Sequence, residues 1–286
     1  MSLKYFIRKS FKKKRKDFYI SDHKDLIFLK EELSNHKIFG IDTEFDWRTT
    51  YFPKLSLIQI SVDKKLFLID CLKVNPKNIL KKFLEDKKIL KIFHSVRSDA
   101  TVLSKCLSIK TKNTFDIQQA EKLLCNNEIK SYGKIVKSFF GINLEKSETN
   151  SNWLKRPLTD MQIRYALDDV DYLLEVYKYQ KKELIKSNLL DKVLSFSKKE
   201  LNLGNESLKK LRLEKNKKKF SFKNREIFLW REDLAEENDV PPAFIFKDKY
   251  LNNLSKIKAK DKFAKKKVMA IIGDTEISEK FISAFL

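Results

Sequence analysis

IFGIDTEF, residues 38–45, alternates between apolar and other side chains as a β-strand does. Successive side chains on a strand point to opposite faces, so the sequence separates into two sets. One face carries the apolar residues Phe39, Ile41 and Phe45. The other face carries Gly40, Asp42 and Glu44. Two carboxylates on one face can grip a single hard cation, although an edge strand with two solvated acids has the same pattern.

A helix is predicted downstream, after Pro157 and a candidate N-cap at Thr159. Its apolar residues recur at helical spacing: Ile163, Ala166, Leu167, Val170, Leu173, Leu174 and Tyr177. Tyr165 and Asp169 are four residues apart, so they lie one turn from each other and can address the same site. Asp168 and Asp171 point elsewhere, and we expect them to be solvated.

A third acidic position lies between these two segments. Residues 88–94 are predicted to form a short strand, residues 95–98 a turn, and Asp99 opens a helix. Taken alone, Asp99 has the features of an N-cap. Together with Asp42, Glu44 and Asp169, however, it completes a set of four carboxylates. Four carboxylates converging on one point repel one another unless cations lie between them, which favours a two-metal site that cleaves phosphodiesters.

The three segments resemble the exonuclease motifs of the DEDD superfamily, in its tyrosine-containing branch, and the surrounding sequence resembles the ribonuclease D family. The motifs are Asp42-x-Glu44, His94-x4-Asp99 and Tyr165-x3-Asp169, and the longest similar stretch is SNWLKRPLTDMQIRYALDDVDYLLEVY. The histidine-type branch has His where this chain has Arg164. The resemblance implies an α/β fold with a ribonuclease-H-like mixed sheet flanked by helices.

The resemblance also implies a mechanism. Asp42, Glu44 and Asp169 would hold one divalent ion, and Asp42 would share a second ion that Asp99 supports through water. Tyr165 would orient the attacking water, and nucleotides would leave RNA 3′ ends as 5′-monophosphates. The all-oxygen ligand set suits two Mg²⁺ or Mn²⁺ ions better than zinc.

Four regions are expected along the chain. Residues 1–16 form a basic arm, residues 17–188 the exonuclease domain, residues 189–206 a linker, and residues 207–286 an all-α helical bundle. The bundle resembles the helicase-and-RNase-D C-terminal (HRDC) module, beginning at REIFLWREDLAEENDV. Gly273-Asp274-Thr275 departs from the Gly-x-Gly that relatives often carry. Trp230 and Phe246 have the chemistry of base-stacking platforms, but core packing is the expectation.

The sequence also predicts roles for three further side chains near the motifs. Lys155 and Arg156 precede the helix that carries Tyr165 and Asp169, so both are candidates for binding substrate phosphate. His94 ends a strand near Asp99, and we expect a hydrogen-bonded structural histidine there.

The positive charge is clustered. Residues 4–16 hold eight Lys or Arg and no acid, residues 198–225 hold 11 against three acids, and residues 256–267 hold seven against one. These segments together account for the formal net charge of +22. Such clustering suits capture of a polyanion, with RNA 3′ ends, including tRNA precursors, as the expected partner. Lysine-rich composition drift is the alternative for the amount of charge.

Other features narrow the function class. No apolar run reaches the ~18 residues that a membrane span requires. The chain has no Walker sequence, which argues against an ATP-driven motor. Cys71, Cys106 and Cys125 show no metal spacing and are an odd number, as expected for reduced thiols in a cytoplasmic protein, and the modular layout suggests a monomer.

Two other functions stay open from the sequence. A DNA 3′-5′ exonuclease would use the same metal chemistry, because discrimination depends on contacts to the 2′-hydroxyl. A nonenzymatic RNA-binding scaffold would need neither the four acids nor Tyr165.

Overall fold

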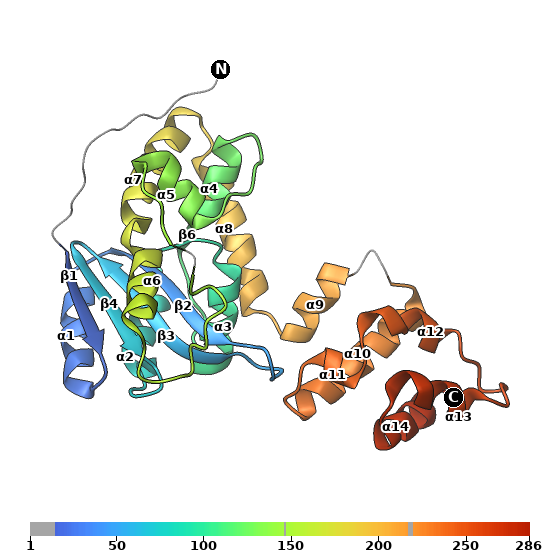
Figure 1. Cartoon of the computed structure of the whole chain (residues 1–286). Coiled ribbons are helices and arrows are strands. Elements are labelled where there is room, and N and C mark those ends of the chain that lie inside the picture. The colour runs from blue at the N-terminus through green and yellow to red at the C-terminus, as the bar shows by residue number, and fades with distance from the viewer. Residues whose placement is uncertain (1–14, 146, 217–219) are drawn as a thin grey trace. The chain divides into compact units, whose positions relative to one another are not determined.

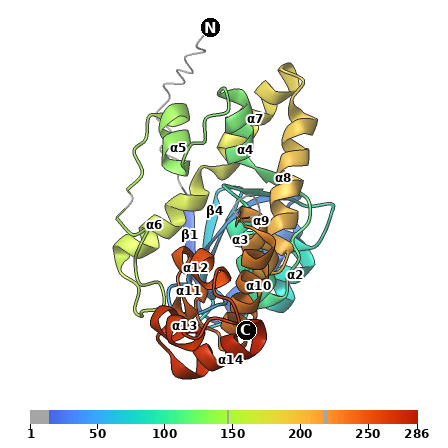
Figure 2. The same cartoon turned by 90° about the vertical axis from the view of Figure 1, so that its right-hand side faces the viewer.

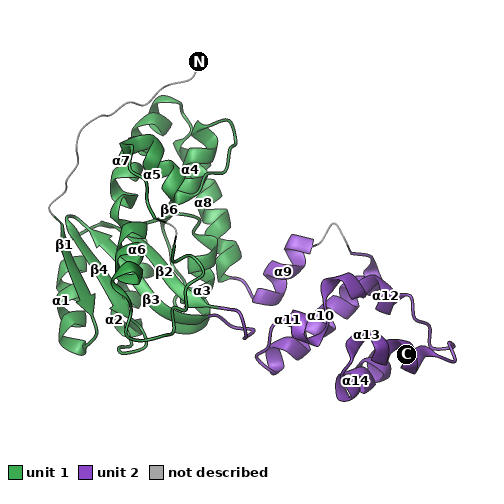
Figure 3. Cartoon of the chain, viewed as in Figure 1, with its two compact units in different colours: residues 1–46, 54–205 green, residues 47–53, 206–286 purple. Residues whose placement is uncertain are grey.

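The computed structural model describes residues 15–145, 147–216 and 220–286. The chain forms two compact units, shown in different colours in Figure 3. The first comprises residues 1–46 and 54–205, and the second comprises residues 47–53 and 206–286. The arm expected over residues 1–16 lies outside the described residues, apart from Arg15 and Lys16.

The first unit is built on a mixed sheet in the order β1-β4-β3-β2-β5-β6 (Figure 1). The strands are β1 Lys16–Ile20, β2 Ile38–Asp46, β3 Lys54–Val62, β4 Lys65–Asp70, β5 Leu90–Phe93 and β6 Thr114–Asp116. The central strands β2, β3 and β4 pair antiparallel, whereas β1 pairs parallel with β4, and β5 with β2 and β6. The expected mixed α/β sheet is therefore confirmed, with β2 inside it rather than at its edge.

Helices cover both faces of this sheet (Figures 1 and 2). They are α1 His23–Ser34, α2 Lys77–Leu84, α3 Arg97–Leu107, α4 Ile117–Leu124, α5 Tyr132–Phe140, α6 Asp160–Asp171, α7 Leu173–Lys186 and α8 Leu190–Asn205. The apolar face predicted for β2 packs in one core: Phe39 and Ile41 lie with residues of α1, α2 and α3. A second core gathers residues of α4 to α7.

Gly40 explains how α7 comes close to β2. A Cβ atom at Gly40 would lie 2.4 Å from Ser61 Oγ and 3.0 Å from Leu173 Cβ. Both separations are shorter than ordinary van der Waals contact. The absence of a side chain at Gly40 therefore lets the start of α7 pack directly against the strand that carries Asp42 and Glu44.

The helix predicted from Thr159 is confirmed at its start and differs at its end. Thr159 and Gln162 form a capping box, with Thr159 Oγ1 accepting the Gln162 N–H at 3.1 Å. The expected continuous helix is instead interrupted at Tyr172, between α6 and α7. Tyr172 N–H donates to the Tyr132 hydroxyl oxygen at 3.0 Å, so the backbone group at the break bonds to a side chain of α5.

The segment expected to be a linker, residues 189–206, contains helix α8. Its Leu201 lies in the same core as β2. A Cβ atom at Gly204 would lie 2.4 Å from Arg97 O, which shows how closely α8 crosses α3. Glu200 of α8 also forms an ion pair with Arg97 of α3.

The second unit is helical, as expected. It contains α9 Leu208–Asn216, α10 Phe222–Glu237, α11 Pro242–Ile245, the 3₁₀ helix η2 Asp248–Tyr250, α12 Leu251–Ser255, α13 Ala264–Ile272 and α14 Thr275–Phe285. Phe246 is buried, and the Trp230 ring packs edge-to-face on Phe281 with centroids 5.5 Å apart. Core packing of these two aromatics is confirmed.

Gly273-Asp274-Thr275 forms the turn between α13 and α14. Gly273 has a φ of 81°, in the left-handed region that favours glycine, and ends α13. Asp274 Oδ1 accepts the Ile277 N–H at 2.8 Å. The N-terminus of α14 is therefore capped by an acidic side chain, which disfavours phosphate at this turn.

Residues 47–53, between β2 and β3, belong to the second unit. Tyr51 is fully buried there, and its hydroxyl donates to Glu232 at 3.1 Å. Asp239 Oδ1 accepts the backbone N–H groups of Tyr51 and Phe52, each at 3.0 Å. No local pattern in residues 47–53 predicts that this connection belongs to the helical unit.

Membrane-spanning helices and disulfide bonds are both absent from the part of the chain that the structure describes. None of its helices has the length and apolar character needed to cross a membrane. Cys71, Cys106 and Cys125 are all free thiols.

Candidate active site

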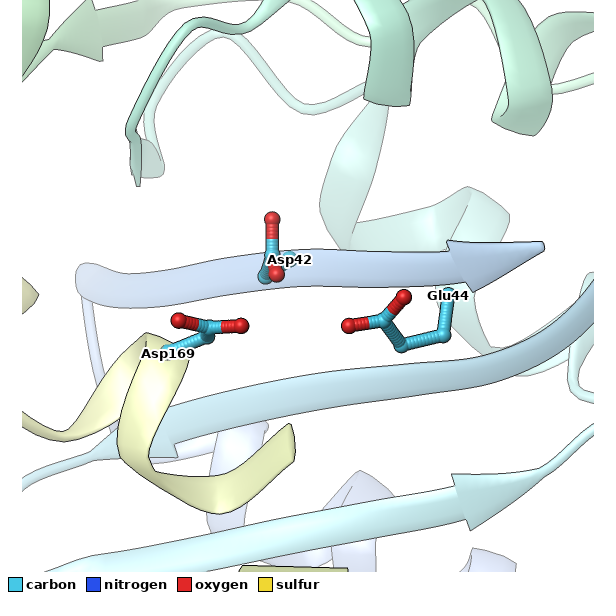
Figure 4. A group of neighbouring side chains, drawn as sticks. All are labelled: Asp42, Glu44 and Asp169. Carbon is cyan, nitrogen blue, oxygen red and sulfur yellow. The ribbon is translucent and has the colours of Figure 1, made fainter. Parts of the chain in front are cut away.

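Three carboxyl groups meet between β2 and α6. Asp42 and Glu44 lie on β2, Asp169 lies on α6, and each offers an oxygen within 4.8 Å of the others. Figure 4 shows the carboxyl groups of Glu44 and Asp169 pointing toward each other beside Asp42. The alternation of β2 and the helical spacing of α6 produce this meeting, because the two elements pack face to face.

The electrostatics of this cluster disfavour three bare charges. Burial raises the pKa of Asp42 well above its usual range, and the charges of Asp99, Asp169 and Glu44 raise it further. Burial and Asp169 raise the pKa of Glu44 in the same way. The pKa of Asp169 rises to about 7 through burial and the neighbouring Asp168.

Asp99 lies in the first turn of α3, next to this cluster but outside the group of three. It is 96 % buried, at 4 % exposure, and its Oδ1 accepts a hydrogen bond of 2.7 Å from the Thr43 hydroxyl. Burial raises its pKa to about 7, against the opposing effect of the Thr43 hydrogen bond. Asp99 does not cap α3, whose N-cap residue is Val96.

The donor set fits a divalent cation. Asp42, Glu44 and Asp169 supply only carboxylate oxygens, the ligand type that hard divalent cations prefer. A bound cation would offset the mutual repulsion that raises their pKa values. The acidic cluster in this fold therefore suits divalent metal use.

Tyr165 lies one turn before Asp169 on α6 and is half-buried. Its hydroxyl oxygen is 3.3 Å from Thr149 Oγ1, and its ring centroid is 5.9 Å from that of Trp153. Burial and the Asp169 charge raise the Tyr165 pKa, so its hydroxyl keeps its proton at neutral pH.

A cavity of about 290 Å³ adjoins these groups. Its lining residues are Asp42, His94, Ser131, Tyr132, Gly133, Leu144, Glu145, Thr149, Tyr165 and Asp169. The cavity therefore gives a substrate access to carboxylates and hydroxyls from β2, α5 and α6.

His94 is hydrogen-bonded, as expected. Its Nε2 lies 3.2 Å from Lys130 O and 3.3 Å from the Gln118 side-chain nitrogen. Burial lowers the pKa of His94, so the ring is neutral at pH 7.

The expectation for Asp171 is wrong. Asp171 is buried rather than solvated, and its Oδ1 forms an ion pair of 2.8 Å with Arg15. Asp168 is partly exposed, 3.7 Å from Arg15 and 3.9 Å from Arg164. The helical position of Asp171 predicted that it points away from the site, but a sequence pattern does not reveal a partner from a distant segment.

Arg156 is unsuited to the phosphate-binding role expected for it. Its Nε and Nη2 each donate to Asp70 at 2.7 Å, and Nη2 also donates to Ser56 Oγ at 3.1 Å. Its Nη1 donates to the carbonyls of Trp153 and Lys155 at 2.7 and 2.9 Å. All five N–H groups of the guanidinium are therefore engaged within the fold. Lys155 is exposed.

Five polar residues around the carboxylates were not predicted from the sequence: Thr43, Ser131, Tyr132, Glu145 and Thr149. Thr43 was detectable in principle, because it lies between Asp42 and Glu44. The other four lie in segments that carry no motif, and only the tertiary packing brings them to the cavity.

Two known protein families match most of the chain. The model of a family described as 3′-5′ exonuclease matches residues 18–185, and that of the HRDC domain matches residues 225–264. A curated ribonuclease D from Desulfotalea psychrophila is 32% identical over 252 residues, which cover 84% of this chain and 66% of that protein. The chain spans less than two thirds of the length of these curated relatives. The share of the relative that is covered ranges from 66% to 41%.

Solved structures show the same fold. Escherichia coli RNase D, described as an exoribonuclease involved in structured RNA processing, matches with a TM-score of 0.80 and 24% identity. The match covers 93% of this chain and 73% of that one. Trypanosoma brucei RNase D in complex with RNA U12 matches with a TM-score of 0.60 and 22% identity, over 68% of this chain and 72% of that one.

Proposed function

The chain belongs to the 3′-5′ exonuclease family, and from this membership we propose that it is a metal-dependent exoribonuclease of the ribonuclease D type. It would shorten RNA from the 3′ end and release nucleoside 5′-monophosphates. The single observation that carries the proposal is the meeting of Asp42, Glu44 and Asp169 within 4.8 Å. The family expected from the sequence, with its HRDC module, is confirmed by the matches over residues 18–185 and 225–264.

We assign the carboxylates to metal binding. Asp42, Glu44 and Asp169 would hold one divalent cation, and Asp42 would share a second that Asp99 supports. Thr43 keeps the Asp99 side chain in place through its hydrogen bond. Two bound cations would stabilise the charge on the attacking and leaving oxygens of the phosphodiester.

The ligand chemistry favours Mg²⁺ or Mn²⁺. Carboxylate oxygens are the preferred donors for these cations, whereas zinc more often recruits His or Cys. His94 does not add a nitrogen ligand in this proposal, because its Nε2 lies 3.2 Å from Lys130 O.

Tyr165 would position the attacking water. Its raised pKa argues for a neutral hydroxyl that accepts or donates a hydrogen bond, rather than for a phenolate base. Its neighbours Thr149 and Asp169 limit the directions that the hydroxyl can take. Lys155, exposed just before α6, remains our candidate for a substrate phosphate contact.

RNA is the proposed substrate. Support comes from the clustered positive charge and from two solved structures: the E. coli protein is an exoribonuclease involved in structured RNA processing, and the T. brucei protein is in complex with RNA U12. Among structured RNAs we propose tRNA precursors. The free cysteines suit a protein acting in the cytoplasm, and we propose a monomer.

A time course on 5′-labelled oligomers tests this function. Single-stranded RNA and DNA of one sequence would be incubated with Mg²⁺, with Mn²⁺ and with EDTA, beside an Asp42→Asn variant. The proposal expects RNA to shorten one nucleotide at a time, only with metal and only with the wild-type protein. Faster shortening of DNA than of RNA would replace the proposal with a DNA exonuclease, and salt-sensitive RNA binding without cleavage would favour the scaffold.

A further inference from the structure

Helix α5 begins at the wall of the cavity. Ser131 is its N-cap residue, Tyr132 and Gly133 are its first two residues, and all three line the cavity together with Asp42 and Asp169. The first N–H groups of a helix have no acceptor within the helix. Their partial positive charge therefore faces the region where the proposed reaction occurs.

The side chain of Ser131 leaves these groups uncapped. It accepts no hydrogen bond from the first turn of α5. Its Oγ is buried and has no hydrogen-bond partner among the described residues. A buried hydroxyl without a partner costs free energy, which a bound ligand would recover.

Tyr132 adds a second available donor. It is 93 % buried, at 7 % exposure, and its hydroxyl oxygen accepts the Tyr172 N–H at 3.0 Å. That bond uses a lone pair and fixes the position of the oxygen. That bond does not use the hydroxyl proton, which can be donated to a ligand. Burial raises the pKa of Tyr132, so the proton stays on the oxygen at neutral pH.

We propose that the start of α5 is a phosphate-binding subsite formed by Ser131, Tyr132 and the adjoining backbone N–H groups. Its ligand would be the phosphate of the 3′-terminal nucleotide, which leaves the site as part of the 5′-monophosphate. The donors of the subsite match the acceptor-only oxygens of a phosphate, and the helix N-terminus favours negative charge. The inference rests on the proposed function, because it assigns the substrate group that α5 holds beside the carboxylates.

The surrounding charge sets the conditions for a test. Asp42, Asp169 and Glu145 also line the cavity, so a phosphate is expected to bind only when divalent cations are present. Calorimetry would measure binding of AMP and of adenosine to the full chain, with Mg²⁺ and with EDTA. AMP contains the phosphate, whereas adenosine offers only the hydroxyls and the base.

Ser131→Ala and Tyr132→Phe are the informative variants. Each removes one donor to a charged group and is expected to raise the Kd for AMP about tenfold, while adenosine binding stays unchanged. Ser138→Ala is the matched serine control, since Ser138 lies on α5 and donates to Ile135 O. Tyr177→Phe is the matched tyrosine control, a buried tyrosine against Phe115.

Tyr132→Phe also removes the acceptor of the Tyr172 N–H, so thermal unfolding would be measured for every variant. If Tyr132→Phe fails to fold, Ser131→Ala decides the question alone. AMP binding that equals the wild type in the folded variants would overturn the subsite. An equal loss of AMP and adenosine binding would overturn it as well, because the groups would then recognise the ribose.

Failure of the subsite is separable from failure of the proposed function. If the wild-type protein degrades RNA and the variants bind AMP normally, the proposed function is supported and the subsite is ruled out. If the wild-type protein binds AMP through Ser131 but cleaves no RNA, the subsite is supported and the proposed function is ruled out. A wild-type protein that binds AMP no better than adenosine, with or without Mg²⁺, overturns the subsite.

Discussion

Thr43 donates its hydroxyl hydrogen to Asp99 Oδ1 across 2.7 Å, and this bond links β2 to the first turn of α3. Both residues are buried, with exposures of 5% and 4%. Thr43 lies between Asp42 and Glu44, so one strand segment carries two proposed ligands and also fixes a third carboxylate.

Thr43→Val should therefore impair catalysis without altering the shape of the strand. The variant leaves buried Asp99 without its donor, and a loss of about 1–3 kcal/mol in the free energy of unfolding is expected. We expect the cleavage rate at saturating RNA to fall as well, because Asp99 can rotate away. Thr43→Ser keeps the hydroxyl and serves as the control. Equal rates for the Val and Ser variants would contradict the role assigned to this bond.

Tyr165→Phe and Asp42→Asn should have different effects on turnover and on metal affinity. Removing the Tyr165 hydroxyl should slow turnover by about 10²-fold and leave metal affinity almost unchanged, since the carboxylates remain. Asp42→Asn should weaken metal binding and abolish detectable cleavage, because Asp42 would contact both cations. Cleavage rates and calorimetric titration with Mn²⁺ would be measured for both variants. Equal, mild effects of the two substitutions would count against the assignment.

The metal-free protein should become more stable as pH falls from 8 toward 6. The pKa of Asp99 and of Asp169 is about 7 in the folded chain, above the usual value of 3.8. The folded state therefore takes up protons that the unfolded state does not, and repulsion within the cluster decreases.

Thermal melting in EDTA at several pH values, beside Asp99→Asn, checks this dependence. The variant should show a weaker rise, and Mg²⁺ should stabilise the wild type more at pH 8 than at pH 6. A wild-type melting temperature that falls along with pH, in parallel with the variant, would show that these carboxyls do not control it.

Arg156→Met should reduce stability rather than RNA affinity. Asp70 is fully buried, and without Arg156 it would keep a charge that lacks its main partner. Breaking such a pair costs about 3–5 kcal/mol. Denaturant unfolding and the KM for RNA would be compared with those of Lys155→Met. The Lys155 variant should instead raise KM while keeping its stability, and the reverse pattern would restore Arg156 as the phosphate contact.

The sequence predicted most of what depends on local periodicity. The alternation through Asp42 and Glu44 and the helical spacing of Tyr165 and Asp169 correspond to β2 and α6. The strand predicted over residues 88–94 corresponds to β5, and the candidate N-cap Thr159 starts α6. These features follow from neighbours in the chain, so a single sequence contains them.

Features that depend on distant partners were not accessible in this way. The partner of Asp171 is Arg15, the partner of Arg156 is Asp70, and neither pairing leaves a local pattern. Helix α8 was taken for a linker because its polar residues outnumber the few that pack, such as Leu201. Tyr132 reaches the cavity only because α5 packs near the break between α6 and α7, where the Tyr132 hydroxyl accepts the Tyr172 N–H.

Product analysis on RNA labelled at its 3′-terminal nucleotide tests whether Asp42, Glu44, Asp99 and Asp169 support metal-dependent hydrolysis from the 3′ end. With Mn²⁺, the account predicts that the label appears first as a nucleoside 5′-monophosphate, and that neither EDTA nor Asp42→Asn samples release it. Release of the label in longer fragments, or as a 3′-phosphate, or undiminished by Asp42→Asn, would contradict the account.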